Sequence, residues 1–152
     1  MASIHSEKTV RVPAEKAWAA LRDIGNPHRL FSGVLTDAKL DGKVRTVTFA
    51  NGMVAQERII DVDDKRRRVA YTVQGEMFQH HSASMEIVPD GPDRCRFIWT
   101  TDLLPDERAQ MVGPLVEQGS MALVRTLESQ PAAAKAMRWR VVSGLRGSLQ
   151  SW

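Results

Sequence analysis

Apolar and polar side chains alternate at the start of the chain. In the segment SIHSEKTVRV, Ile4, Val10 and Val12 occupy even positions, and every odd position from 5 to 11 is polar. A period of two is typical of a half-buried β-strand. Pro13 ends this pattern, and apolar residues then recur at helical spacing up to residue 24. Residues 26–33, with Pro27 at the first helical position, predict a second short helix.

Residues 34–104 contain repeated signals for β-hairpins. Asp41-Gly42 and Asn51-Gly52 are dipeptides that favour tight two-residue turns. The remaining residues are divided into strands by a polar turn at 61–67, a glycine at position 75 and the segment PDGPD. We therefore predict six further short strands, which must be antiparallel because the turns that join consecutive strands are short.

A long helix is predicted from Pro105 to about residue 130. Its apolar positions, which include Met111, Leu115 and Leu127, follow a helical stripe, and Asp106 and Glu107 lie in its first turn. A curved antiparallel sheet needs such an element to cover its apolar face. The expected element order is one strand, two short helices, six strands and one long helix.

The composition is that of a single globular domain. The chain has 152 residues, of which 43% are hydrophobic and 26% charged. It contains no apolar run long enough for a membrane span, and its first residues lack the apolar core of a signal peptide, so we expect a cytoplasmic protein. The one cysteine, Cys95, lies in a strand-like segment and is expected to be a buried core residue. We expect a monomer or a homodimer.

The positive charge is concentrated at the C-terminal end. Residues 131–152 hold four of the 21 basic residues and no acidic residue, which leaves 17 basic residues against 18 acidic ones in residues 1–130. A nucleic-acid-binding domain normally has a basic surface on its folded body, so the sequence argues against nucleic acid as a partner. We predict a domain over residues 1–130 and a basic extension over 131–152. The extension could be flexible, or it could contact an acidic surface or the membrane interface through Trp139 and its neighbouring arginines.

Four segments resemble the START-like, Bet v 1-like (SRPBCC) superfamily, and within it the polyketide cyclase/dehydrase and lipid-transport-like family. They are VRVPAEKAWAALRDIGNPHRLFSGV, ERIIDVDDKRRRVAYTV, DRCRFIWTTDLLPD and GPLVEQGSMALVRTLES. The resemblance covers about residues 3–129. It implies an α+β helix-grip fold, in which a seven-stranded antiparallel sheet wraps around the long C-terminal helix and encloses a largely apolar cavity. Members of this superfamily bind sterols, lipids, polyketides or plant hormones, and some catalyse cyclisation, dehydration or condensation.

The alternation of side chains along each strand indicates which residues would line such a cavity. His81 shares a strand face with Ala83 and Met85, whereas His80 shares its face with Ser82 and Ser84. His81 should therefore point inward and His80 outward. By the same reasoning, and from the helical stripe, the expected ligand-binding residues are Val47, Phe49, Tyr71, His81, Met85, Trp99, Met111 and Leu115.

Two functions remain open from the sequence. The first is the binding of a small hydrophobic ligand, lipidic, aromatic or polyketide-like, without a cofactor. The second is a cyclase or dehydratase reaction in the same cavity, with His81 or Tyr71 as acid or base and Glu57 as a further candidate. Both faces of the strand around Glu57 mix apolar and polar residues, so the direction of its side chain is undetermined.

A protein-interaction module of related fold is a third, remoter possibility. Metal binding is not supported, because the four histidines show no metal-binding spacing.

Overall fold

One antiparallel sheet forms the body of the protein. The structure, a computed structural model, describes residues 1–129, so the predicted extension at 131–152 lies outside the described residues. The sheet contains β1 (Ala2–Val10), β2 (Leu35–Asp41), β3 (Val44–Phe49), β4 (Val54–Asp63), β5 (Arg68–Val73), β6 (His80–Pro89) and β7 (Cys95–Leu104). Their order is β1-β7-β6-β5-β4-β3-β2, and each neighbouring pair is antiparallel. The predicted fold class is confirmed.

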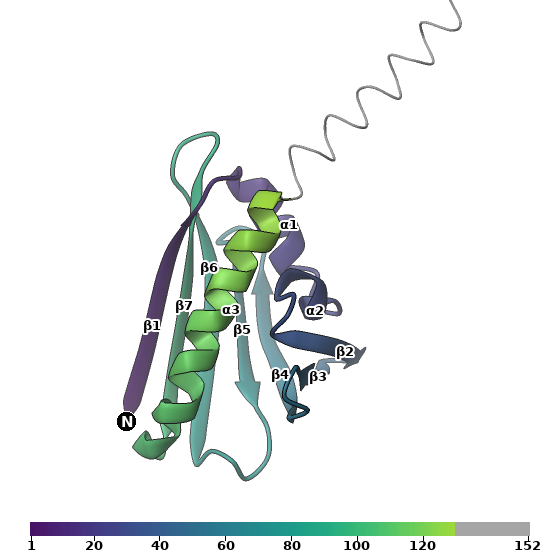
Figure 1. Ribbon diagram of the computed structural model, residues 1–152, viewed down its shortest axis with the longest axis vertical. Coiled ribbons are helices and arrows are strands. Elements are labelled where there is room, and N and C mark those ends of the chain that lie inside the picture. The colour runs from purple at the N-terminus through teal and green to yellow at the C-terminus, as the bar shows by residue number, and fades with distance from the viewer. Residues whose placement is uncertain (130–152) are drawn as a thin grey trace, which may run out of the picture.

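The helices lie on one face of this sheet (Figure 1). They are α1 (Ala14–Leu21), α2 (Pro27–Leu30), the short 3₁₀ helix η1 (Asp106–Arg108) and α3 (Ala109–Ser129). The long helix α3 crosses the sheet diagonally, and α1 and α2 lie beside its C-terminal half (Figure 1). Within residues 1–129, no helix combines the length and the hydropathy that a membrane crossing requires.

Polar contacts attach α3 to β1, one of the two edge strands of the sheet. The hydroxyl of Ser6 donates to that of Ser120 at 3.0 Å, and both side chains are buried. Lys8 Nζ lies 2.6 Å from Glu117 Oε1 near the surface. Serine at the buried contact allows the helix and the strand to approach closely, because its side chain is short. These contacts hold the helix along one side of the sheet.

The packed core fills one end of the space between the helices and the sheet. Trp18 of α1 and Leu127 of α3 meet Ile87 and Phe97 of the sheet, and each of these side chains is at most 4% exposed. Cys95 is fully buried in the same cluster, and burial raises the pKa of its thiol to about 11. Cys95 therefore packs as an apolar core residue, as its position in the sequence predicts.

A β-bulge changes the facing of side chains in the middle of β4. The register against β5 shifts between Ile59 and Asp61. Ile59 is 5% exposed, whereas the next residue, Ile60, is 57% exposed. Beyond the bulge, Val62 packs against the core again. One extra residue therefore explains why apolar and polar residues occur on both faces of this segment in the sequence.

Gly119 allows α3 to lie directly against Trp99 of β7. A Cβ atom at position 119 would lie 2.8 Å from Cζ3 of the Trp99 indole, which is closer than carbon atoms can approach without movement. Gly119 is also buried in the helix–sheet interface. The short distance between α3 and the sheet at this point therefore requires a residue without a side chain at position 119.

We predict that Gly119→Ala lowers the free energy of unfolding in urea denaturation. Overpacking of a filled site costs about 1–3 kcal/mol, and we expect this cost to exceed the roughly 1 kcal/mol that alanine gains in helix propensity. In a Trp99→Phe background the shorter ring removes the clash, so the same substitution should be neutral or stabilising. An equal loss of stability in both backgrounds would show that Trp99 does not set the helix position.

Candidate functional site

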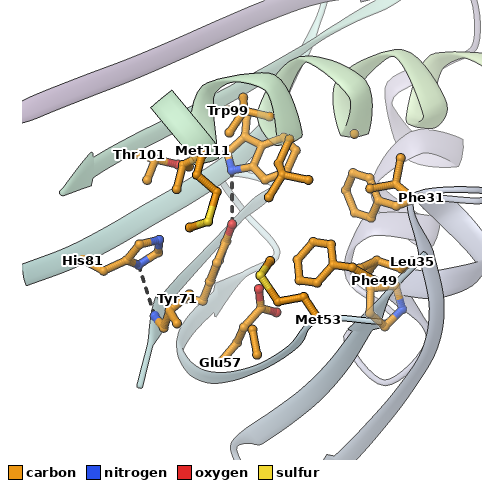
Figure 2. A pocket seen from close by; sticks show the side chains of 18 of the residues that line it. Phe31, Leu35, Phe49, Met53, Glu57, Tyr71, His81, Trp99, Thr101 and Met111 are labelled. Atoms are coloured by element: carbon orange, nitrogen blue, oxygen red, sulfur yellow. Dashed lines mark hydrogen bonds between the residues drawn. The ribbon is translucent and has the colours of Figure 1, made fainter. Parts of the chain in front are cut away.

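A mostly apolar cavity lies between α3 and the inner face of the sheet, next to the packed core (Figure 2). Its internal volume is about 100 Å³. An apolar cavity of about 150 Å³ is known to hold benzene, so this space is smaller than the one that accommodates a single unsubstituted ring there. The apolar part of its wall consists of Pro27, Phe31, Val34, Leu35, Phe49, Met53, Ala55, Val73, Met77, Phe78, Met85, Trp99, Met111, Val112, Leu115 and Val116.

The structure brings nearly all of the expected site residues to this cavity. Among those expected from strand and helix patterns, the residues that line it are Phe49, Tyr71, His81, Met85, Trp99, Met111 and Leu115. Val47 is the exception: it is 1% exposed on the inner face of β3, but it is not part of the cavity wall. Strand alternation identifies a face of the sheet, and not which positions on that face border empty space, so a ligand contact of Val47 stays a prediction.

The two adjacent histidines point to opposite faces of β6, as the alternation predicts. His81 is 9% exposed and borders the cavity. His80 is exposed on the outer face, where its Nε2 lies 3.3 Å from the hydroxyl oxygen of Ser82. A shared site formed by both imidazoles is therefore excluded by geometry.

A backbone hydrogen bond determines which nitrogen of the His81 ring carries the hydrogen. The backbone N–H of Val73 donates to Nδ1 of His81 at 3.1 Å (Figure 2). An accepting Nδ1 carries no hydrogen, so the hydrogen of the neutral ring is on Nε2. Burial, with a smaller contribution from the charge of His80, lowers the pKa of His81 to about 4. At neutral pH His81 is therefore an uncharged ring with a donating Nε2–H.

Tyr71 and Trp99 form a second polar pair in the cavity wall. The indole N–H of Trp99 donates to the hydroxyl oxygen of Tyr71 at 3.2 Å (Figure 2). Burial is the main cause that raises the pKa of Tyr71, and the charge of Glu57 adds to it. Tyr71 therefore remains a phenol, and within residues 1–129 its hydroxyl hydrogen has no protein acceptor.

A buried ion pair lies below Tyr71. Arg45 of β3 and Glu57 of β4 are directly opposite each other in the sheet, with Arg45 Nε 2.8 Å from Glu57 Oε1. A second nitrogen of Arg45 donates to the carbonyl oxygen of Ile24 at 3.2 Å, and its Cζ lies 5.8 Å from the centre of the Tyr71 ring. Arg45 and Glu57 are 6% and 9% exposed. Glu57 therefore points inward, and its charge is balanced by Arg45.

Sequence patterns did not identify several residues of the wall. Arg45 could have been found, because it has the same strand facing as Phe49, and that facing is inward. Phe31, Met53 and Phe78 lie in connections between strands and helices, where no periodicity indicates direction. Within the described part of the chain, no three His, Cys, Asp or Glu side chains are grouped to hold a metal ion.

Comparison with known proteins supports the same architecture. The chain is similar to the MLP-like protein 423 of Arabidopsis thaliana, with 29% identity over 91 residues that represent 51% of this chain and 59% of the relative. It thus spans less than two thirds of that relative's length. An uncharacterised Bacillus thuringiensis protein superposes with a TM-score of 0.75 at 18% identity, over 83% of this chain and 98% of the other.

A second solved structure with this fold is an enzyme. Norcoclaurine synthase from Thalictrum flavum, in complex with dopamine and hydroxybenzaldehyde, superposes with a TM-score of 0.67 at 19% identity, over 86% of this chain and 88% of the enzyme. At such identities the likeness concerns the fold. The model of one protein family, described as polyketide cyclase / dehydrase and lipid transport, matches residues 1–148. The chain belongs to the polyketide cyclase/dehydrase and lipid transport family.

Proposed function

We propose that this protein binds a small, largely apolar molecule in the cavity beneath α3. The observation that carries the proposal is the composition of the wall, where aromatic, methionine and aliphatic side chains surround a few polar groups. Such a wall provides apolar contact area, and its polar groups orient the ligand. Burial of apolar surface is worth about 25 cal/mol per Å², so apolar contact supplies the favourable free energy of such binding.

The size of the cavity limits the ligands that it can hold. A volume of about 100 Å³ is below the roughly 150 Å³ that holds benzene elsewhere, so a single substituted ring would enter only with small shifts of the adaptable methionine side chains in the wall. A larger ligand would require movement of α3 or of the loop at 74–79. Norcoclaurine synthase, which shares the fold, has been solved with dopamine and hydroxybenzaldehyde, both of which are single-ring aromatics. A single-ring aromatic compound is therefore the first class to test.

The state of the polar groups favours binding over acid–base catalysis by His81 or Tyr71. A general base needs a free lone pair and a pKa near the working pH. The Nδ1 lone pair of His81 is occupied by Val73, and the pKa of the ring is lowered to about 4. The pKa of Tyr71 is raised, and the carboxylate of Glu57 is bonded to Arg45. His81 and Tyr71 are therefore better suited to donating hydrogen bonds than to removing protons, and the Glu57 carboxylate already accepts from Arg45.

We predict that wild-type protein binds α-methylstyrene, and that Ala55→Leu weakens this binding at least tenfold. Ala55 lines the cavity, so the larger side chain would occupy ligand space. Ala70→Leu is the matched control, because Ala70 lies between the buried Val69 and Tyr71 on β5 and therefore points away from the cavity. Dissociation constants can be measured by ¹H–¹⁵N NMR titration. Equal binding by the wild type and both variants would place the ligand outside the cavity, and no binding by the wild type would refute the proposal.

We also predict that His81 makes stability depend on pH between about 6.5 and 4. The unfolded chain takes up a proton at His81 near its ordinary pKa of 6.5, whereas the folded protein does so only near 4. Stability should therefore fall as the pH decreases through this range, by at most about 3 kcal/mol, and this contribution should level off below pH 4.

Urea denaturation of His81→Asn and His80→Asn at several pH values isolates this effect. The asparagine amide oxygen at position 81 can still accept from Val73, but it does not titrate. We expect a flatter pH profile for His81→Asn than for the wild type, and an unchanged profile for His80→Asn. Parallel profiles for the wild type and His81→Asn would contradict the neutral state of His81.

A further inference from the structure

We propose that the cavity selects ligands that carry a neutral hydrogen-bond acceptor, such as a ketone or aldehyde oxygen, which Tyr71 and His81 hold together. This inference rests on the proposed function and deepens it, because it names the chemical class of the ligand's polar end. The remaining part of the ligand would be hydrocarbon.

Two hydrogen-bond donors at one end of the cavity have no protein acceptor. Tyr71 accepts from Trp99, and His81 accepts from Val73, so each group uses its accepting atom within the protein. Within residues 1–129, neither the hydroxyl hydrogen of Tyr71 nor Nε2–H of His81 has a protein partner. A hydroxyl that already accepts a hydrogen bond is polarised and donates more strongly. Both groups therefore offer donors, and a ligand oxygen is the missing acceptor.

The two donors are close enough in space to share one ligand group. The ring centres of Tyr71 and His81 are 5.9 Å apart, and both side chains border the cavity. Figure 2 shows His81, Tyr71 and Thr101 around the same part of the cavity, while Phe31, Leu35 and Phe49 lie at the opposite end. Thr101 is 1% exposed and adds a hydroxyl to the polar end. A ligand would therefore place its oxygen near His81 and its hydrocarbon part near Phe31.

The charges of the wall disfavour an anionic ligand. Arg45 is the one Lys or Arg side chain of the described residues that borders the cavity, and Glu57 neutralises it at 2.8 Å. A carboxylate that entered would lose its hydration without gaining an unpaired cation, and it would approach the Glu57 charge. A neutral carbonyl has neither cost. The wall therefore matches a ketone or an aldehyde better than a fatty acid or another carboxylate.

Two probes of nearly equal shape separate hydrogen bonding from apolar contact. Acetophenone has a carbonyl oxygen at the position where α-methylstyrene has a methylene group. Benzoate supplies an anionic counterpart of similar size. We would measure dissociation constants of all three by NMR titration, with wild-type protein, Tyr71→Phe and His81→Asn. His81→Asn keeps an acceptor for Val73 and removes the ring Nε2–H; the amide N–H₂ that it introduces is on a shorter side chain.

Each donor should contribute one hydrogen bond to acetophenone. Either substitution should therefore weaken acetophenone binding about five- to tenfold and change α-methylstyrene binding by less than about twofold. Benzoate should bind to the wild type at least tenfold more weakly than acetophenone. The α-methylstyrene values also serve as a control for altered packing, because any structural damage would affect both neutral probes equally.

The possible results separate this inference from the function on which it rests. If α-methylstyrene binds and both substitutions affect acetophenone no more than α-methylstyrene, carbonyl recognition is refuted while apolar binding stands. Tighter binding of benzoate than of acetophenone would refute selection for a neutral group. Failure of the wild type to bind either neutral probe would refute the binding function itself, and the inference with it.

Discussion

The inner face of the sheet is wider than one helix can cover. Seven strands at a spacing of about 4.8 Å span roughly 29 Å, whereas an α-helix with its side chains is roughly 10 Å across. The Ser6–Ser120 and Lys8–Glu117 contacts hold α3 on the β1 side. The sheet must therefore curve towards the helix to shield the rest of its apolar face. At one end α1 completes the packing, and at the other end the space is left as a cavity.

Arg45, Glu57, Tyr71 and His81 of the cavity wall each have a hydrogen-bond partner within the protein. Glu57 balances Arg45, and Trp99 donates to Tyr71. His81 receives a hydrogen bond from the backbone of the neighbouring strand. Buried polar groups are costly when they lack partners, so each pair makes the burial of its members tolerable. The pairing also determines chemical character, because Tyr71 and His81 each accept inside the protein and keep one hydrogen to offer a ligand.

Sequence patterns predicted those parts of the structure that are regular. Alternation located the strands and placed His81 inside, and helical spacing placed Met111 and Leu115 on the inner side of α3. The pattern failed at Glu57 because the β4 bulge places inward and outward residues out of step. It also did not distinguish Val47, which faces inward but is not part of the cavity wall, from the inward residues that line the wall.

Other parts of the site depend on tertiary contacts that no local pattern contains. Phe31 and Phe78 reach the cavity from connecting segments, whose direction depends on what they pack against. The state of His81 depends on a hydrogen bond from Val73, a residue on another strand. The pairing of Arg45 with Glu57 depends on strand register, which side-chain alternation alone does not determine.

Methionine methyl groups provide the most direct test of where a ligand lies. Met53, Met77, Met85 and Met111 line the cavity, whereas Met121 is 51% exposed on the same helix as Met111. With methyl-¹³C methionine and α-methylstyrene, intermolecular nuclear Overhauser effects report which methyl groups contact the bound ring. A ligand inside the cavity predicts contacts to several of the four lining methionines and none to Met121. Contacts to Met121 without any to the lining methionines would contradict binding beneath α3.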